Sequence, residues 1–217
     1  MAGPRSPKGR ALETMRRLAG EYPGSAVELC ELDHTNPFQL LCATILSAQT
    51  TDQRVNMVTP TLFARYPTPE ALAAANPADV EELIHSTGFF KNKTKSLIGM
   101  ANALVDRFGG EVPEKLDDLV TIPGVGRKTG NVIRSVAMGQ PGLPVDTHVG
   151  RLVRRLAITD ETDPVKVELV LNEMIPASER GTFSLRVILH GRRVCFARKP
   201  ACVSCVLADY CPSVGTG

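Results

Sequence analysis

The chain of 217 residues lacks long apolar runs and carries little net charge, and these absences narrow its class. No stretch approaches the roughly 18 apolar residues that a membrane-spanning helix needs. The opening segment MAGPRSPKGR is basic with no apolar segment behind it, so it does not form a secretory signal. A net charge of +2 is too small to indicate a nucleic-acid partner by itself. We therefore predict a cytoplasmic protein without a membrane segment.

Internal repeats, low-complexity segments and the alternating pattern of a β-strand are also missing. Apolar residues recur at helical spacing instead, beginning with Leu12, Met15 and Leu18. Residues suited to cap a helix precede several later segments, namely Asn36, Thr51 or Asp52, Asp163 and Ser178. A hydrophobic content of 43% with 22% charged residues is that of an ordinary globular protein. The sequence thus predicts an all-α fold.

A glycine turn joins two of these helical segments. The segment 116–122 (LDDLVTI) has apolar residues at helical spacing and ends at Pro123. Gly124-Val125-Gly126 then forms a tight turn in which neither glycine carries a Cβ, and a second helix follows. The backbone N–H groups that start this second helix suit a phosphate oxygen. A plain helix–helix connection is the alternative.

Lys128 and Asp146 are the residues near this turn that can carry chemistry. Lys128 lies in the first turn of the second helix, beside Arg127. A free lysine has a pKa of about 10.4, and a nucleophilic amine needs burial, a neighbouring cation or a helix start to lower it. Asp146 stands before another helical segment, where it can cap the helix or stabilise positive charge on a sugar. A phosphate contact for Lys128 and a cap for Asp146 are the simpler interpretations.

The motif GVGRKTGNV followed by VDTHVGRL resembles the helix-hairpin-helix-Gly/Pro-Asp DNA glycosylases, and most closely their endonuclease III branch. The resemblance covers nearly the whole chain. It implies two helical domains flanking a cleft. Residues 30–140 would form a six-helix barrel domain with the hairpin, and residues 1–29 with 141–217 a discontinuous iron–sulfur domain. Lys128 would approach the cleft from one side and Asp146 from the other.

The resemblance also implies which residues contact DNA. Gln49, in LSAQTTDQRVN, would enter the duplex where the damaged nucleotide leaves the stack, although a solvated loop glutamine is the simpler interpretation. Phe89 would act as a wedge, with Phe90 in place of the family's usual tyrosine, and an aromatic pair in the core is the alternative. The lysines of segment 91–95 would lie beside phosphates. The DNA-binding residues that we predict are Gln49, Phe89, Gly124, Val125, Gly126, Arg127, His148, Arg198 and Lys199.

Four of the six cysteines form a C-terminal group with the spacing C-x6-C-x2-C-x5-C: Cys195, Cys202, Cys205 and Cys211. In a chain without a signal segment, a metal site is favoured over disulfides. Ligand chemistry alone allows structural zinc or a [4Fe–4S] cluster. The resemblance to the endonuclease III loop implies a [4Fe–4S] cluster, whose loop would hold Arg198 and Lys199 against the DNA backbone. Cys30 and Cys42 are predicted core thiols.

The function that the resemblance implies is that of a bifunctional DNA glycosylase and AP lyase. It would remove oxidised pyrimidines from duplex DNA through a Schiff base on Lys128 and β-elimination. Its partner would be double-stranded DNA with damaged bases or abasic sites, and we expect a monomer. Mismatch adenine glycosylases lack this lysine, and oxoguanine glycosylases usually lack the cluster. A monofunctional mismatch glycosylase and a non-catalytic DNA-binding hairpin module are the alternatives, while an iron–sulfur electron carrier would explain only the cysteine group.

Overall fold

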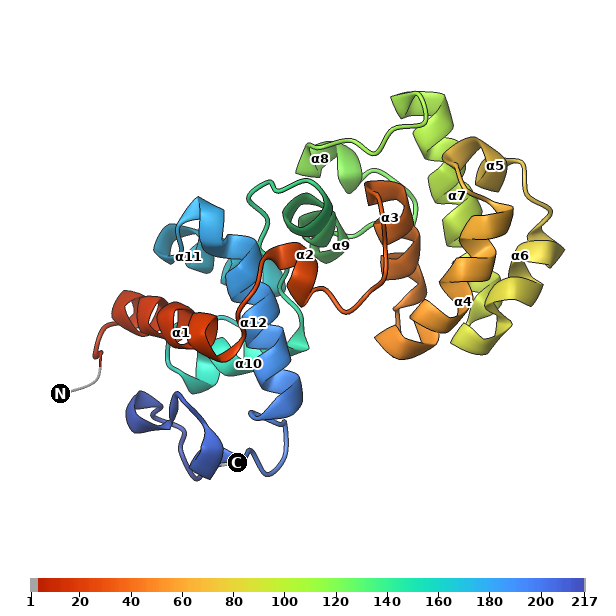
Figure 1. The fold of residues 1–217 in the computed structure, drawn as a ribbon. Coiled ribbons are helices and arrows are strands. Elements are labelled where there is room, and N and C mark those ends of the chain that lie inside the picture. Colours follow the sequence, from red (N-terminus) through yellow and green to blue (C-terminus); the bar gives the residue numbers. More distant parts are fainter. Residues whose placement is uncertain (1–3, 217) are drawn as a thin grey trace. The chain divides into compact units, whose positions relative to one another are not determined.

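The computed structural model describes residues 4–216, which form two compact units. We call Cys30–Gln140 the continuous unit, and the described residues on either side of it, 4–29 and 141–216, the split unit. Helices are the only regular elements of the described chain, which confirms the all-α prediction (Figure 1). None of its helices is long and apolar enough to cross a membrane.

The helices of the continuous unit are α3 (Pro37–Leu46), α4 (Asp52–Arg65), α5 (Pro69–Ala73), α6 (Pro77–Ile84), the 3₁₀ turn η1 (His85–Thr87), α7 (Phe90–Phe108), α8 (Leu116–Leu119), α9 (Arg127–Val132) and the π-helical η2 (Ile133–Ala137). Those of the split unit are α1 (Pro7–Glu21), α2 (Ala26–Leu29), α10 (Thr147–Arg155), α11 (Pro164–Met174), η3 (Ala177–Glu179), α12 (Arg180–Arg193), η4 (Cys202–Ser204) and η5 (Ala208–Tyr210).

Most of the predicted caps begin their helices as expected. The side chains of Asn36, Thr51 and Asp163 each accept hydrogen bonds from backbone N–H groups in the first turns of α3, α4 and α11. Such bonds satisfy donors that the helix itself leaves unpaired. The prediction for Ser178 is wrong, because this residue lies inside the short 3₁₀ turn η3 and α12 starts only after it.

The core of the continuous unit forms around α3 and α7. Helix α3 packs against α4 and α7, and α5 and α6 both pack along α7 (Figure 1). Leu40, Leu41 and Leu97 are fully buried there, as is the predicted core thiol of Cys42. Burial raises the pKa of the Cys42 thiol, so this cysteine behaves as an inert apolar side chain. Cys30, the other predicted core thiol, is only partly buried.

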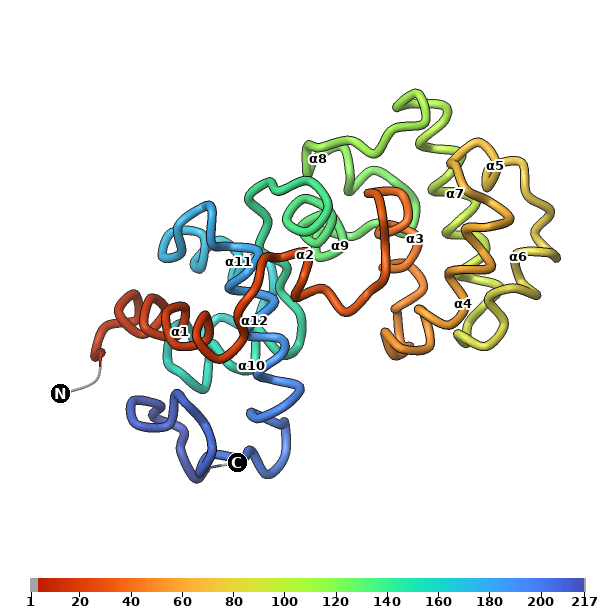
Figure 2. The backbone as a smooth tube through the Cα atoms, in the orientation of Figure 1, coloured from red at the N-terminus to blue at the C-terminus, as the bar shows by residue number. Residues whose placement is uncertain are grey.

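In the split unit, the N-terminal helix α1 packs beside the C-terminal cysteine segment. Helices α1, α2 and α10 pack against α12, and Figure 2 traces α1 (red) and the C-terminal segment (blue) within this unit. The Arg17 guanidinium donates to the carbonyl of Val206 at 2.7 Å, and it also pairs with the Asp209 carboxylate. The hydroxyls of Thr14 and Tyr210 are 2.9 Å apart in the buried interior. Helix α1 therefore anchors the cysteine segment.

Candidate active site and cysteine loop

The hairpin forms from α8, the glycine turn and α9. Gly124 has a φ of 79°, and a Cβ there would lie 2.9 Å from the Cβ of Ser96, so both conformation and space require glycine. Gly126 differs, because its backbone is extended and nothing lies within 4 Å of the position that a Cβ would take. The turn thus requires only its first glycine. The second leaves open space in front of α9, whose start no side chain caps.

Close packing makes the hairpin rigid. Val125 is 5% exposed and its N–H donates to the carbonyl of Ile122 at 3.0 Å, so its side chain and its donor both serve the turn. A Cβ on Gly130 would lie 2.7 Å from the Cδ1 of Leu116, which shows how closely α8 approaches α9. Phosphate contacts of the hairpin must therefore come from groups other than the N–H of Val125.

Lys128 is exposed at the second position of α9 in the continuous unit. Of the three features that favour a nucleophilic amine, it has the helix start and the adjacent cation, Arg127. It lacks the third feature, burial, because its side chain is exposed. An exposed amine on a rigid hairpin is placed to reach a substrate.

Asp146, in the split unit, caps α10. Its Oδ1 accepts a hydrogen bond from the N–H of Val149 at 2.9 Å, which confirms the predicted cap. This bond occupies one carboxylate oxygen, and the partly buried carboxylate has a second oxygen to offer. The residue can thus serve the helix and a substrate together.

His148 lies in the first turn of α10 and is fixed by Arg151. An Nη2 of Arg151 lies 3.1 Å from the Nδ1 of His148. Burial lowers the pKa of His148, while the charge of Asp146 opposes the shift. The same guanidinium donates to the carbonyls of Gly191 and Cys195 at 3.0 and 2.8 Å. Helix α10 is thereby tied to the start of the cysteine segment.

Gln49 and Phe89 are both exposed and both have left-handed backbones. Gln49 has a φ of 55° in the turn after α3, and Phe89 has a φ of 47° directly before α7. Phe89 is 65% exposed, whereas the ring of Phe90 packs 4.4 Å from that of His85. Left-handed conformations are unfavourable for such residues and persist where the surroundings enforce them, commonly at functional sites. The structure presents both side chains to solvent within the continuous unit.

Lys93 is not a surface lysine, and its prediction as a phosphate contact is wrong. Lys91 and Lys95 are exposed, but Lys93 is 5% exposed. Its Nζ donates to the Oγ1 of Thr50 and to the carbonyl of Thr87, both at 2.8 Å. The sequence did hold a signal, because Lys93 precedes the apolar Leu97, Met100 and Leu104 on one helical stripe.

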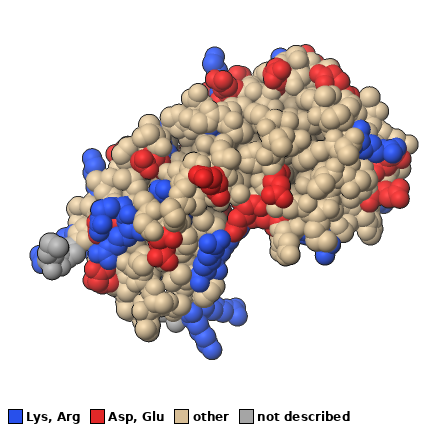
Figure 3. Space-filling model, viewed as in Figure 1, with Lys and Arg blue, Asp and Glu red and all other residues tan. Residues whose placement is uncertain are grey.

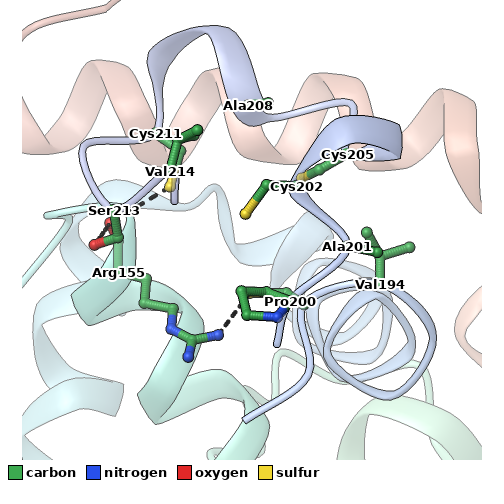
Figure 4. A pocket seen from close by; sticks show the side chains of 11 residues that line it. Arg155, Val194, Pro200, Ala201, Cys202, Cys205, Ala208, Cys211, Ser213 and Val214 are labelled. Atoms are coloured by element: carbon green, nitrogen blue, oxygen red, sulfur yellow. Dashed lines mark hydrogen bonds between the residues drawn. The ribbon is translucent and has the colours of Figure 1, made fainter. Parts of the chain in front are cut away.

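The four C-terminal cysteines line one pocket in the split unit (Figure 4). The side chains of Cys202 and Cys211 point into it, and Arg155 reaches toward it from α10 (Figure 4). Apolar residues complete the wall: Val194, Pro200, Ala201, Ala208 and Val214. Within residues 4–216 no three His, Cys, Asp or Glu side chains converge closely enough to hold a single metal ion. Four thiols around one pocket are a donor set that suits a [4Fe–4S] cluster.

Comparison with known proteins identifies the family. The model of the HhH-GPD superfamily base excision DNA repair protein matches residues 42–177, which contain the hairpin, Lys128 and Asp146. The model of the iron–sulfur binding domain of endonuclease III matches residues 195–211, a range that begins and ends at a cysteine. Endonuclease III of Synechocystis sp. is 52% identical over 96% of this chain and 94% of its own length. The chain belongs to the endonuclease III family.

Solved structures of endonuclease III agree with this assignment. A non-covalent endonuclease III–DNA complex and a trapped covalent endonuclease III–DNA intermediate each have a TM-score of 0.88 with this chain and 40% sequence identity. Each comparison covers 94% of this chain and 95% of the other. Like its family, the protein is a base excision repair DNA glycosylase with AP lyase activity, its partner is DNA with damaged bases or abasic sites, and it carries a [4Fe–4S] cluster.

The surroundings of the cysteine pocket suit an anionic cluster. A guanidinium N–H of Arg155 lies 3.3 Å from the Sγ of Cys195, and the Nε2 of His190 lies 3.2 Å from the Sγ of Cys205. Hydrogen bonds to thiolate sulfurs of this kind tune a cluster's potential. Burial raises the pKa of the Cys205 and Cys211 thiols, so bound iron must compensate the charge of their thiolates.

The loop between the first two of these cysteines carries the predicted basic pair. Arg198 and Lys199 are exposed, and Lys199 has a left-handed φ of 52°. Arg155 holds this loop, because its two terminal nitrogens donate to the carbonyls of Phe196 and Ala197 at 2.7 and 2.9 Å. Figure 3 shows Lys and Arg side chains gathered over α1 and toward the C-terminal end of α12. The structure thus offers cations on a fixed loop of the split unit.

Proposed function

We propose that this endonuclease III excises oxidised pyrimidines from duplex DNA with Lys128 as its nucleophile. The observation that carries the proposal is the position of Lys128, which is exposed at the uncapped start of α9 in a rigid hairpin. A trapped covalent intermediate of a 40% identical endonuclease III supports chemistry through a protein–DNA bond. A base inside a duplex is out of reach, so the damaged nucleotide must leave the stack first.

The chemistry follows from a neutral amine. Lys128 Nζ forms a bond to the sugar C1′, and the electron pair of the glycosidic bond leaves with the base, which takes up a proton. The amine loses its proton and the sugar ring opens to give a Schiff base. The positive charge of the Schiff base acidifies the neighbouring C2′ proton, whose loss expels the 3′ phosphate by β-elimination. A single lysine thus serves both base release and strand cleavage.

For Asp146 we propose electrostatic stabilisation. As the base leaves, positive charge develops on the sugar, and a fixed carboxylate lowers the energy of that state. Its cap on the N–H of Val149 fixes the carboxylate in advance, so little reorganisation is needed during the reaction. The bond to Val149 uses Oδ1, and we assign Oδ2 to the substrate.

We further propose that the four pocket cysteines, Cys195, Cys202, Cys205 and Cys211, ligate the cluster. When bound, the cluster cross-links the loop and so fixes Arg198 and Lys199 against the DNA backbone. The continuous unit would be the barrel domain of the family, and the split unit its iron–sulfur domain. Gln49 and Phe89 would enter the duplex, with Gly124, Gly126, Arg127 and His148 at the backbone. We also propose that the protein acts as a monomer. We propose that it acts in the bacterial cytoplasm, because the similar proteins are bacterial.

Borohydride trapping on a duplex with a single thymine glycol tests the nucleophile. Borohydride reduces a Schiff base to a stable adduct, so the wild type should become covalently attached to the DNA. Lys128→Ala should give no adduct and no base release. Lys95→Ala is the matched control, because Lys95 is also exposed near a helix start but lies outside the hairpin.

The possible results separate the alternatives. An adduct in the wild type and in Lys95→Ala, but not in Lys128→Ala, would establish the role of Lys128. Base release without an adduct would mean a monofunctional glycosylase and would refute that role. DNA binding with neither adduct nor base release would leave only the non-catalytic hairpin module. Replacing thymine glycol with an oxidised purine tests the substrate class, and faster release of the purine would refute it.

A further inference from the structure

Lys93 fastens two turns that are far apart in the sequence. Its ammonium donates to the Oγ1 of Thr50 and to the carbonyl of Thr87, both at 2.8 Å. The hydroxyl of Thr50 also donates to the carbonyl of Thr87. These bonds join residues 47–51, which we call the Gln49 turn, to residues 87–90, which we call the Phe89 turn. The join is internal to the continuous unit.

Stability does not explain a lysine at this position. Lys93 is 5% exposed, and burial lowers the pKa of its ammonium because a charge is costly to remove from water. It also lies in the first turns of α7, where the helix dipole disfavours a cation. An apolar side chain would continue the buried stripe of Leu97, Met100 and Leu104 without either cost. The position therefore calls for a role other than stability.

Both fastened turns present a strained residue to solvent. Gln49 (φ 55°) follows Ala48 in one turn, and Phe89 (φ 47°) follows Gly88 in the other. Each has an exposed side chain, and each lies next to a residue that the ammonium contacts, Thr50 or the Thr87–Gly88 peptide. A strained backbone keeps its conformation only when its neighbours hold it. The bonds of Lys93 supply that restraint to both turns together.

We propose that Lys93 is a positioning residue that locks the Gln49 turn and the Phe89 turn into one two-pronged wedge, which opens the base pair at a lesion. The proposal deepens the proposed function, on which it rests for the entry of Gln49 and Phe89 into DNA. Two prongs held in fixed register separate a base pair without first having to be ordered on the DNA. Lys93 itself touches neither the substrate nor the reacting atoms.

Base-pair opening can be measured without any chemistry. A duplex with thymine glycol opposite 2-aminopurine becomes more fluorescent when the pair opens, and the Lys128→Ala background prevents turnover. In that background, Lys93→Met should lower the opening constant by about 10-fold, the value of one charge-assisted hydrogen bond. When Lys128 is intact, Lys93→Met should lower the single-turnover rate of base release by a similar factor. Cleavage of a preformed abasic site, which has no base to extrude, should change by less than about 3-fold.

Lys166→Met is the matched control, because Lys166 is exposed in α11 of the split unit and its replacement removes the same charge. Opening should stay at the wild-type level in this control. Wild-type opening in Lys93→Met, or an equal loss in Lys166→Met, would overturn the proposal. If Lys93→Met does not fold, Thr50→Val removes the shared hydroxyl at nearly constant shape, and full opening in that variant would overturn it equally. An absence of borohydride adduct would refute the role of Lys128 without changing the opening assay.

Discussion

Gly191 is the point at which one methyl group should disturb the start of α10, where we propose that Asp146 acts on the substrate. A Cβ at this position of α12 would lie 2.8 Å from the Nδ1 of His148, 2.9 Å from the Cβ of His148 and 3.1 Å from an Nη2 of Arg151. An ordinary contact of a Cβ is 3.4 Å or more, so the two helices must separate by about 0.6 Å. The imidazole cannot simply swing away, because its Cβ is also too close.

The expected loss can be isolated by comparison with Gly20→Ala. Both glycines are helical, but a Cβ on Gly20 in α1 would meet nothing within 4 Å. Alanine gains about 1 kcal/mol of helix propensity at either position, so this contribution cancels between the two variants. Overpacking costs about 1–3 kcal/mol, and Gly191→Ala should therefore be about 2 kcal/mol less stable than Gly20→Ala.

Urea unfolding followed by far-UV circular dichroism measures this difference, provided that the two variants have equal m-values. Single-turnover base release should also fall in Gly191→Ala, since the strained contact involves the first turn of α10 that Asp146 caps. Equal stability of the two alanine variants would refute the packing argument. Equal base release would refute the link between Gly191 and the catalytic turn.

Four further predictions rest on single contacts. Asp146→Asn should keep the cap and the stability but lose base release by about 100-fold, whereas Asp163→Ala, measured by the same assays, should lose about 1 kcal/mol of stability and no activity. Gly124→Ala should destabilise the fold in urea, because its φ is 79°, while Gly126→Ala should unfold like the wild type but bind DNA more weakly. Arg198→Ala and Lys199→Ala should weaken binding to damaged and undamaged DNA alike, and each should reduce the salt slope by about 0.9, with exposed Lys166→Ala as a control. The folded-state pKa of Lys93 is lowered by burial, so the unfolded chain binds more protons and the wild type should gain stability relative to Lys93→Met as the pH rises toward the ordinary lysine value.

Features that depend on neighbours in the sequence were predictable. Asn36, Thr51, Asp146 and Asp163 cap the helices that follow them, because a cap acts within three residues of itself. Ser178 failed because a cap signal does not distinguish an α-helix from the 3₁₀ turn that precedes one here. The cysteine spacing indicated a metal site, and the family comparison settled its kind.

Contacts between distant parts of the chain were not predictable. The apolar stripe of α7 could have indicated that Lys93 is buried, but only the folded chain brings Thr50 and Thr87 to its ammonium. The two glycines of the hairpin likewise look equivalent in the sequence. Ser96 of α7 is the neighbour that makes Gly124 indispensable, while Gly126 meets open space. Such distinctions arise from tertiary packing, which a single sequence does not display.

Four residues of the continuous unit break local conformational or electrostatic preferences, and all four belong to the surfaces that we propose to contact DNA or to the bonds that hold them. Gln49 and Phe89 have backbone conformations that their residue types disfavour, and Lys93 and Lys128 place cations at helix starts where the dipole opposes them. Scattered over a fold, such features would only lower its stability. Here three of them belong to one fastened pair of turns, and the fourth lies at the uncapped end of the hairpin. For the exposed Lys128, a DNA backbone is the partner that turns a cation at a helix start from a cost into an attraction. Buried Lys93 would act indirectly, by holding the two turns for the DNA. The residues that weaken the free protein should therefore strengthen its complex.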